Sequence, residues 1–194
     1  MSLHERIAVT SWFEIFFTEN RGMAFGMDFV GTMALTLFRV VAIVFFIYYL
    51  ARLIRRKASV PVIVCLALVI AGAAGNVIDN CFYGLIFSES PEAYFFQGPA
   101  SLVPFGQGYG DFLSGKVVDM FYFPLWQWPE WMPFVGGQMF FNAVFNVADA
   151  AITCGAVALL ILYYVRAYRQ SQAEKVAAQA EDAQSDAPIV KPND

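Results

Sequence analysis

Three long apolar stretches constrain this chain more than any other feature of its sequence. They run roughly over residues 29–50, 60–78 and 140–165 and carry few charged side chains. A helix needs about 20 residues to cross the hydrocarbon core of a bilayer. Because lipid offers no hydrogen bonds to an exposed backbone, stretches of this kind fold as helices. The sequence therefore predicts an all-α membrane protein, a transmembrane helix bundle with three spans.

The composition agrees with a membrane setting. Hydrophobic residues make up 59% of the chain and aromatic residues 17%, whereas only 14% are charged. Such values are typical of membrane proteins, so membrane lipids are the expected neighbours, and the absence of a basic patch argues against nucleic acid. We predict one membrane-embedded domain over residues 1–169. Residues 170–194 are polar and predict a disordered cytoplasmic tail.

Basic residues mark one end of the bundle. They lie between the first two spans and after the third: Arg52, Arg55, Arg56, Lys57, Arg166, Arg169 and Lys175. The positive-inside rule places these connections in the cytoplasm. The long segment 81–139 has a single basic residue, Lys116, and is expected outside. Its Trp-rich run, residues 126–133, either anchors the segment at the membrane interface, which is the commoner use of such residues, or supports the lipid of a substrate.

The amino-terminal part is also expected outside. Residues 7–18 are rich in aromatic and β-branched side chains and predict a short β element. A start on this side of the membrane predicts a preceding membrane helix that this sequence does not contain. An apolar stretch in frame upstream in the genomic DNA would test that expectation.

Two polar motifs interrupt the apolar stretches. They are GNVIDN (residues 75–80) and FNVAD (residues 145–149), and each places an Asn three residues before an Asp. If both are helical, Asn76 and Asp79 share one face, as do Asn146 and Asp149. An amide in that place can donate to the carboxylate or hold a substrate carbonyl. The alternative is that these polar side chains join helices by hydrogen bonds.

Three acids are expected to meet at the outer face. Asp79 ends the second span, Asp149 lies near the start of the third, and Asp119 lies in the segment between them. Two carboxylates in a place of low dielectric constant share a proton. Such a pair can act as acid and base on a water that attacks an amide, without metal or cofactor. Helix placement alone pairs Asp79 with Asp149.

Four short blocks in order resemble those of lipoprotein signal peptidase (signal peptidase II). They are NRGMAF (residues 20–25), GNVIDN, KVVDM (residues 116–120) and FNVADAAI. The corresponding family blocks read N-x-G-A-A-F, G-N-x-x-D-R, V-V-D-F and F-N-x-A-D. The match covers about Ser11 to Val165.

The resemblance implies a four-helix protein of the bacterial cytoplasmic (inner) membrane with a small extracytoplasmic β-cradle. Such enzymes remove signal peptides from diacylglyceryl-modified prolipoproteins on the amino side of the lipidated cysteine. By position, Asp119 and Asp149 are the catalytic pair, which overrules the pairing of Asp79 with Asp149. The residues implied as supporting or substrate-binding are Asn20, Asn76, Asp79 and Asn146. No metal or cofactor is implied, lipid-modified prolipoproteins are the partners, and we expect a monomer.

This chain departs from the family pattern in three ways. Asn80 stands where the family block ends in Arg, the outer segment is long, and the family's first helix is absent.

Within the spans, Gly72 and Gly75 predict close helix approach. Arg39 lies in mid-span, where an ion pair or hydrogen bond to another helix is favoured over a substrate contact.

A non-enzymatic transporter or proton-relay subunit is the alternative function. Transporters usually spread ionisable groups through the depth of the membrane or are built from inverted repeats. The acids gather on one side here, and the two N-x-x-D motifs are the one repeat, so the sequence favours the peptidase.

Overall fold

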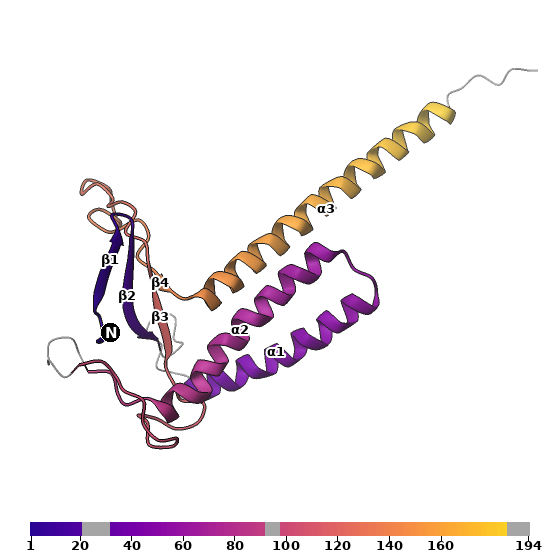
Figure 1. The fold of residues 1–194 in the computed structure, drawn as a ribbon. Helices are drawn as coiled ribbons and strands as arrows, with labels where there is room; N and C mark the ends of the chain where they lie inside the picture. The colour runs from indigo at the N-terminus through magenta and orange to yellow at the C-terminus, as the bar shows by residue number, and fades with distance from the viewer. Residues whose placement is uncertain (21–31, 92–97, 186–194) are drawn as a thin grey trace, which may run out of the picture.

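Three long helices and a small antiparallel sheet make up the protein (Figure 1). The computed structural model describes residues 1–20, 32–91 and 98–185. The helices are α1 (Thr32–Arg55), α2 (Val60–Ile86) and α3 (Val147–Ser185). All three are long and apolar enough to cross a membrane. The structure thus confirms the predicted helix bundle with a small sheet.

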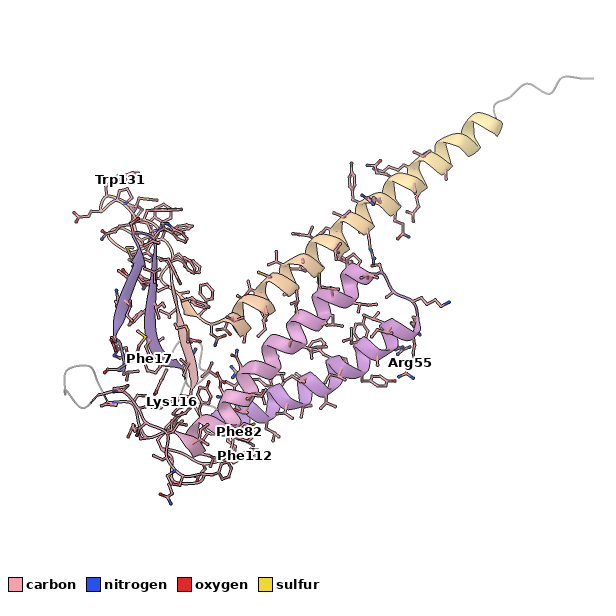
Figure 2. All side chains as sticks on the ribbon, in the orientation of Figure 1. Phe17, Arg55, Phe82, Phe112, Lys116 and Trp131 are labelled. Atoms are coloured by element: carbon pink, nitrogen blue, oxygen red, sulfur yellow. The ribbon has the colours of Figure 1, made fainter. Side chains whose placement is uncertain are left out.

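Helix α2 packs against both α1 and α3. It begins after Ser59, and Pro61 lies in its first turn, where the missing backbone N–H of proline does no harm. On α1 and α3, large apolar side chains point away from the bundle and are exposed, among them Phe38 and Leu160. In a membrane, lipid covers such side chains. The α1–α2 connection, where Arg55 is labelled, lies at the end of the bundle away from the sheet (Figure 2).

The sheet has the strand order β1-β2-β3-β4, and every neighbouring pair is antiparallel. Its strands are β1 (Arg6–Thr10), β2 (Phe13–Asn20), β3 (Val117–Tyr122) and β4 (Val144–Phe145). The predicted β element over residues 7–18 is therefore a hairpin of β1 and β2. In the β2–β3 pair, Thr18 lies opposite Asp119 and Asn20 opposite Val117. This register brings the end of β2 beside Asp119.

The helix limits differ from those predicted. The third span begins at Val147 and not near residue 140, because the preceding residues form loops and strand β4. The second helix continues to Ile86, so Asp79 lies inside it and not at its end. Helix α3 extends to Ser185, well into the segment predicted as a tail, whose last residues, 186–194, lie outside the described part of the chain.

Gly72 allows the close approach of α2 and α3 that the sequence predicted. A Cβ atom at this position would stand 2.3 Å from the backbone oxygen of Ala148, in the first turn of α3. At Gly75 an added Cβ would meet the Ala148 Cβ at 3.4 Å, an ordinary contact. A side chain at residue 72 therefore has to push the start of α3 away, whereas one at residue 75 does not.

We expect Gly72→Ala to lower the free energy of unfolding by about 1–3 kcal/mol, the usual range for overpacking. Gly75→Ala is the matched control and is expected to change it much less. Thermal unfolding of both variants in detergent checks this. Equal destabilisation by the two substitutions would contradict the close contact at Gly72.

Candidate active site

Asn146 occupies the N-cap of α3. Its Oδ1 atom accepts a hydrogen bond of 2.9 Å from the backbone N–H of Asp149, and Asp149 Oδ2 accepts one of 3.4 Å from the backbone N–H of Asn146. This reciprocal arrangement is a capping box with Asp in the third helical position. The prediction that Asn146 shares a helical face with Asp149 is therefore wrong, because Asn146 precedes the helix and starts it.

The Asn146 amide group also joins three elements of the fold. Its Nδ2 atom lies 2.9 Å from Asp119 Oδ1 on β3, 3.2 Å from Asn76 Oδ1 on α2 and 3.3 Å from the backbone oxygen of Val118. The side chain is nearly buried. One residue at the start of α3 thus sets the positions of β3 and α2 around it.

Asn76 is hydrogen-bonded to the acid of the other motif. Its Nδ2 atom donates to Asp149 Oδ1 across the α2–α3 interface, at 2.8 Å. The two N-x-x-D motifs are therefore not equivalent: one is a helix cap, and the other supplies an Asn that reaches from one helix to the next. Asn76 and Asp79 share a face of α2, as expected, and line the same pocket. The amide group of Asn76 nevertheless donates to Asp149 on α3, which is the alternative of a bond between helices.

Asp119 is buried, with 2% of its surface exposed. It lies in β3, and Asn20 of β2 donates to its Oδ2 atom at 3.2 Å. Burial raises the pKa of Asp119 from its ordinary value to about 6. The hydrogen bonds from Asn20 and Asn146 oppose this rise, whereas the charge of Asp149 adds to it. Asp149 is thus close enough to influence the protonation of Asp119.

Asp79 lies to one side of this pair. It is in polar contact with the Tyr83 hydroxyl and the backbone N–H of Val118. It also lines a pocket of about 250 Å³, together with Asn76 and Asn146. Neither Asp119 nor Asp149 is part of that lining. The two Asn side chains lie between the pocket and the two acids, because Asn76 donates to Asp149 and Asn146 donates to Asp119.

A chain of two hydrogen bonds connects α1, through α2, to the segment before β3. Arg39 Nη1 donates to Asn80 Oδ1 at 3.1 Å, and Asn80 Nδ2 donates to the backbone oxygen of Gly115 at 2.6 Å. Asn80 is fully buried. This confirms a hydrogen bond between helices for Arg39. The Arg39 charge also acts on Asp149, so α1 supplies a cation in the region where the related sequence block ends in Arg.

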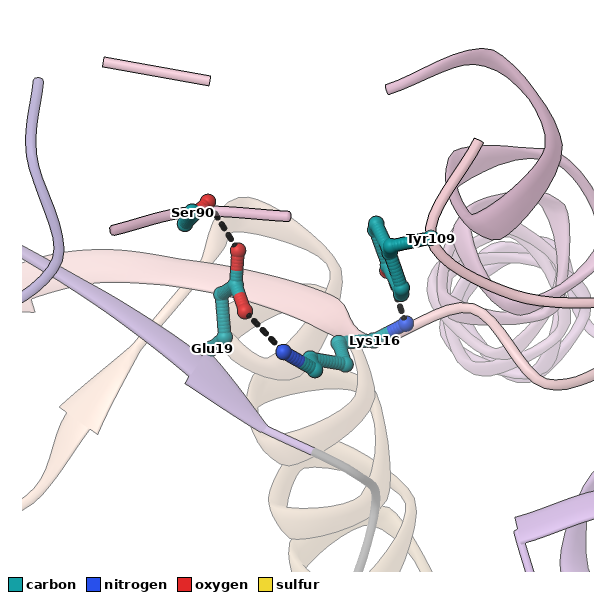
Figure 3. Close-up of polar contacts among 4 residues, drawn as sticks. All are labelled: Glu19, Ser90, Tyr109 and Lys116. Atoms are coloured by element: carbon teal, nitrogen blue, oxygen red, sulfur yellow. Dashed lines mark hydrogen bonds and ion pairs between the residues drawn. The ribbon is translucent and has the colours of Figure 1, made fainter. Parts of the chain in front are cut away.

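A buried ion pair lies on the other face of the sheet. Lys116 Nζ is 2.7 Å from Glu19 Oε2, and their side chains are 13% and 7% exposed. Ser90 donates to Glu19, and the backbone N–H of Lys116 donates to the Tyr109 hydroxyl at 2.7 Å (Figure 3). Glu19 precedes Asn20, and Lys116 begins the KVVDM block. Because side chains alternate along a strand, the pair leaves the Asp119 face free while holding β2 to the start of β3.

Sequence reasoning did not find this ion pair. Glu19 and Lys116 are 97 residues apart in the sequence, and neither lies in an apolar stretch. Its one sequence signal is that Lys116 is the sole basic residue of the long segment 81–139. Among the residues that the sequence did predict, the described structure brings Asn20, Asn76, Asp119, Asn146 and Asp149 into one hydrogen-bonded network.

Comparison with known proteins gives a consistent result. The family model described as Signal peptidase (SPase) II matches residues 1–165. A lipoprotein signal peptidase of Porphyromonas gingivalis is 47% identical over 168 residues, which cover 84% of this chain and 72% of that protein. A lipoprotein signal peptidase of Amoebophilus asiaticus is 36% identical, over 78% of this chain and 61% of that protein.

Solved structures share the fold. Two bacterial membrane enzyme structures, determined by the in meso method at 2.3 and 1.9 Å resolution, are 18% and 20% identical to this chain. They superpose with TM-scores of 0.51 and 0.52, over 84% of this chain and 73% and 77% of theirs.

The raised pKa of Asp119 predicts how stability depends on pH. The folded protein binds this proton more tightly than the unfolded chain, so stability decreases as the pH rises from about 4 to about 6. The full loss is at most about 3 kcal/mol, since one pKa unit is worth about 1.4 kcal/mol. Asp119→Asn has no carboxyl group to titrate at this position, so its stability relative to the unsubstituted chain should increase between pH 4 and pH 7. Thermal unfolding at both pH values checks this, and a constant difference would contradict the raised pKa.

The Arg39–Asn80 hydrogen bond predicts non-additive effects. Arg39→Met leaves the buried Asn80 Oδ1 without this donor, which costs about 1–3 kcal/mol. Asn80→Ala should cost less in the Arg39→Met background than alone, with a coupling energy of about 1 kcal/mol. Arg52→Met, at the basic end of α1, is the matched control and should be nearly neutral. Additive losses in the unfolding free energy would rule out the interaction.

Proposed function

This chain belongs to the signal peptidase (SPase) II family, and on that premise we propose that it is an aspartic endopeptidase that processes lipoproteins. It removes signal peptides from diacylglyceryl-modified prolipoproteins and cuts on the amino side of the lipidated cysteine. The observation that carries this proposal is the position of Asp119. It is buried near Asp149, and Asn146 connects the two, because its amide N–H donates to Asp119 and its amide oxygen accepts from the backbone N–H of Asp149.

The proposed mechanism requires one proton for two carboxyl groups. Asp119 and Asp149 together hold that proton, and the pair, not either residue alone, determines the titration. The ionised carboxylate accepts a proton from a water molecule while the water oxygen attacks the peptide carbonyl carbon. The protonated carboxyl group donates to the carbonyl oxygen. When the peptide bond breaks, the proton taken from the water is transferred to the nitrogen of the leaving amine. A pKa of about 6 for Asp119 suits a group that must both accept and release a proton near neutral pH.

The amide side chains keep these acids in place. Asn20 and Asn146 donate to Asp119, and Asn76 donates to Asp149. Each carboxylate therefore has a fixed orientation before substrate arrives. Asn76 and Asn146 also line the pocket beside the pair, which we propose receives the peptide next to the scissile bond. Asp79 lies on the same lining, in a supporting role.

We propose that the site lies at the extracytoplasmic face of the bacterial inner membrane. The α1–α2 connection, where Arg55 is labelled, lies at the end of the bundle away from the sheet (Figure 2), and Arg166 of α3 donates to Ser59 in this connection. The positive-inside rule makes that end cytoplasmic and the sheet end extracytoplasmic. Signal peptides of exported lipoproteins reach this side of the membrane with their lipid anchored in the adjoining leaflet, at the level where α3 begins.

Substitution of either acid tests the pair directly. We expect Asp119→Asn and Asp149→Asn each to reduce cleavage of a diacylated precursor by at least about 100-fold, the lower end of the usual contribution of acid–base catalysis. Asp111→Asn, an exposed acid of the outer segment, is the matched control and should retain activity. The assay uses purified protein in detergent or vesicles, with folding checked by thermal unfolding. Retained cleavage in both dyad variants would refute the mechanism.

Two comparisons in the same assay test the other parts of the proposal. Asp79→Asn distinguishes the rival pairing: if it abolishes cleavage while Asp119→Asn does not, Asp79 and Asp149 are the catalytic acids. A precursor without the diacylglyceryl group should be cut far more slowly than the lipidated one. Equal rates for both precursors would contradict the proposed substrate class and leave the dyad intact.

A further inference from the structure

The loop between β3 and β4 forms a hairpin rich in aromatic residues, which we name the aromatic hairpin (residues 124–140). Backbone hydrogen bonds close it: Phe140 donates to Trp126, Trp128 donates to Gln138, and Gly137 donates to Trp128, at 2.8, 2.8 and 3.0 Å. The side chain of Gln127 donates to the Gly137 carbonyl at 2.6 Å. The hairpin thus has a hydrogen-bonded base, residues 126–128 and 137–140, and a tip, residues 129–136.

The base and the tip of the hairpin use their aromatic residues differently. At the base, the rings of Trp126 and Phe140 are stacked with centroids 3.8 Å apart, and Trp128 meets Phe140 edge on. At the tip, Trp131 is 79% exposed and Phe134 is 97% exposed. Phe134 also has a φ of 69°, a backbone conformation that bulky residues avoid. The fold therefore holds two large apolar side chains outward, one of them in an unfavourable backbone conformation.

The hairpin lies close to the place where the chain enters the membrane. Phe140 is followed within a few residues by β4 and then by Val147, the first residue of a helix long enough to span a bilayer. Phe123, which directly precedes the hairpin, stacks on Phe145 of β4, two residues before α3 begins. Trp131 marks the end of the sheet farthest from the C-terminus of α2, where Phe82 and Phe112 lie (Figure 2).

Charge distinguishes this surface from an ordinary exposed loop. Between residues 120 and 148, Glu130 is the only charged residue. Segments that are rich in Trp and other aromatic residues are typical of the membrane–water interface. Exposed apolar patches of this kind mark contacts with a membrane or another protein. The bundle already places this chain in lipid, so the leaflet beside α3 is the partner within reach.

We propose that the aromatic hairpin inserts Trp131 and Phe134 into the membrane leaflet on the sheet side of the bundle. The occupant of this surface is the boundary between phospholipid headgroups and acyl chains. With α3 at one side and the hairpin at the other, the sheet that carries Asp119 is held at a fixed level on the membrane. This function is separate from peptide cleavage and does not depend on it.

The test measures the depth of the tip in the full chain, reconstituted in vesicles of phosphatidylcholine and phosphatidylglycerol. Cys65, Cys81 and Cys154 are replaced by Ala, and Phe134→Cys is labelled with a polarity-sensitive fluorophore. The matched control is Phe105→Cys, which is 71% exposed in the segment after α2. Lipids with a spin label in the acyl chain should quench the probe at residue 134 at least twofold more than the probe at 105, and aqueous iodide should show the opposite order.

Two outcomes would overturn the proposal. If iodide quenches residue 134 as strongly as residue 105 and the spin-labelled lipid does not, the tip lies in water. If neither quencher reaches residue 134, the tip is covered by protein. A second measurement avoids the labelled cysteine: brominated lipids should quench the tryptophan fluorescence of the unsubstituted chain more than that of Trp131→Tyr. Equal quenching of the two proteins would also overturn the proposal.

Discussion

The hydrogen bonds of Asn146 are the interaction on which the rest of the site depends. This one side chain begins α3 by accepting from the backbone of Asp149, and its amide group donates to Asp119 on β3 and to Asn76 on α2. Helix start, sheet position and helix packing are therefore coupled at one residue. Gly72 makes the coupling possible, because it lets α2 come against the first turn of α3, where a Cβ atom would collide with the Ala148 oxygen.

Burial changes the protonation of Asp119. A buried carboxylate is stable only when donors surround it, and both acids of the proposed pair receive amide N–H groups. These donors favour the ionised form of Asp119, yet burial and the nearby Asp149 outweigh them, so its pKa rises to about 6. The site thus contains a carboxyl group whose titration midpoint, at about pH 6, is much closer to neutral pH than that of an ordinary aspartate. The Glu19–Lys116 pair, on the opposite face, holds the two strands that present Asn20 and Asp119.

Much of the fold follows from the sequence, because an apolar stretch in lipid has to satisfy its backbone hydrogen bonds internally and therefore folds as a helix. The three helices and the close approach at Gly72 are predictable on that basis, and the β element near the amino terminus is predictable from its aromatic and β-branched residues. The helix ends were not, since an apolar loop such as residues 140–145 reads like the start of a span until its strand pairing is known. The motif FNVAD contains a capping box, whose signal is an Asn followed three residues later by an acid. Inside an apolar run, the same spacing also fits one face of a continuous helix.

The site residues were named from motifs, whereas their partners required the structure. Nothing in the sequence indicates that Asn76 bonds to Asp149 and not to Asp79, because that choice depends on how α2 and α3 cross. The contacts of Arg39 with Asn80 and of Lys116 with Glu19 likewise join residues far apart in the chain. The aromatic hairpin is intermediate: its composition indicated the membrane interface, and the structure shows which of its rings pack at the base and which are exposed at the tip.

The proposed chemistry depends on the effect of the Asp149 carboxylate on the protonation of Asp119. The most direct measurement is a pH titration of aspartate carboxyl carbons by ¹³C NMR on the protein in detergent, with Asp119 assigned by its loss in Asp119→Asn. We expect Asp119 to titrate with a pKa of about 6, and we expect this pKa to fall in Asp149→Asn, where the neighbouring charge is gone. An Asp119 titration that is the same with and without the Asp149 carboxylate would contradict this expectation.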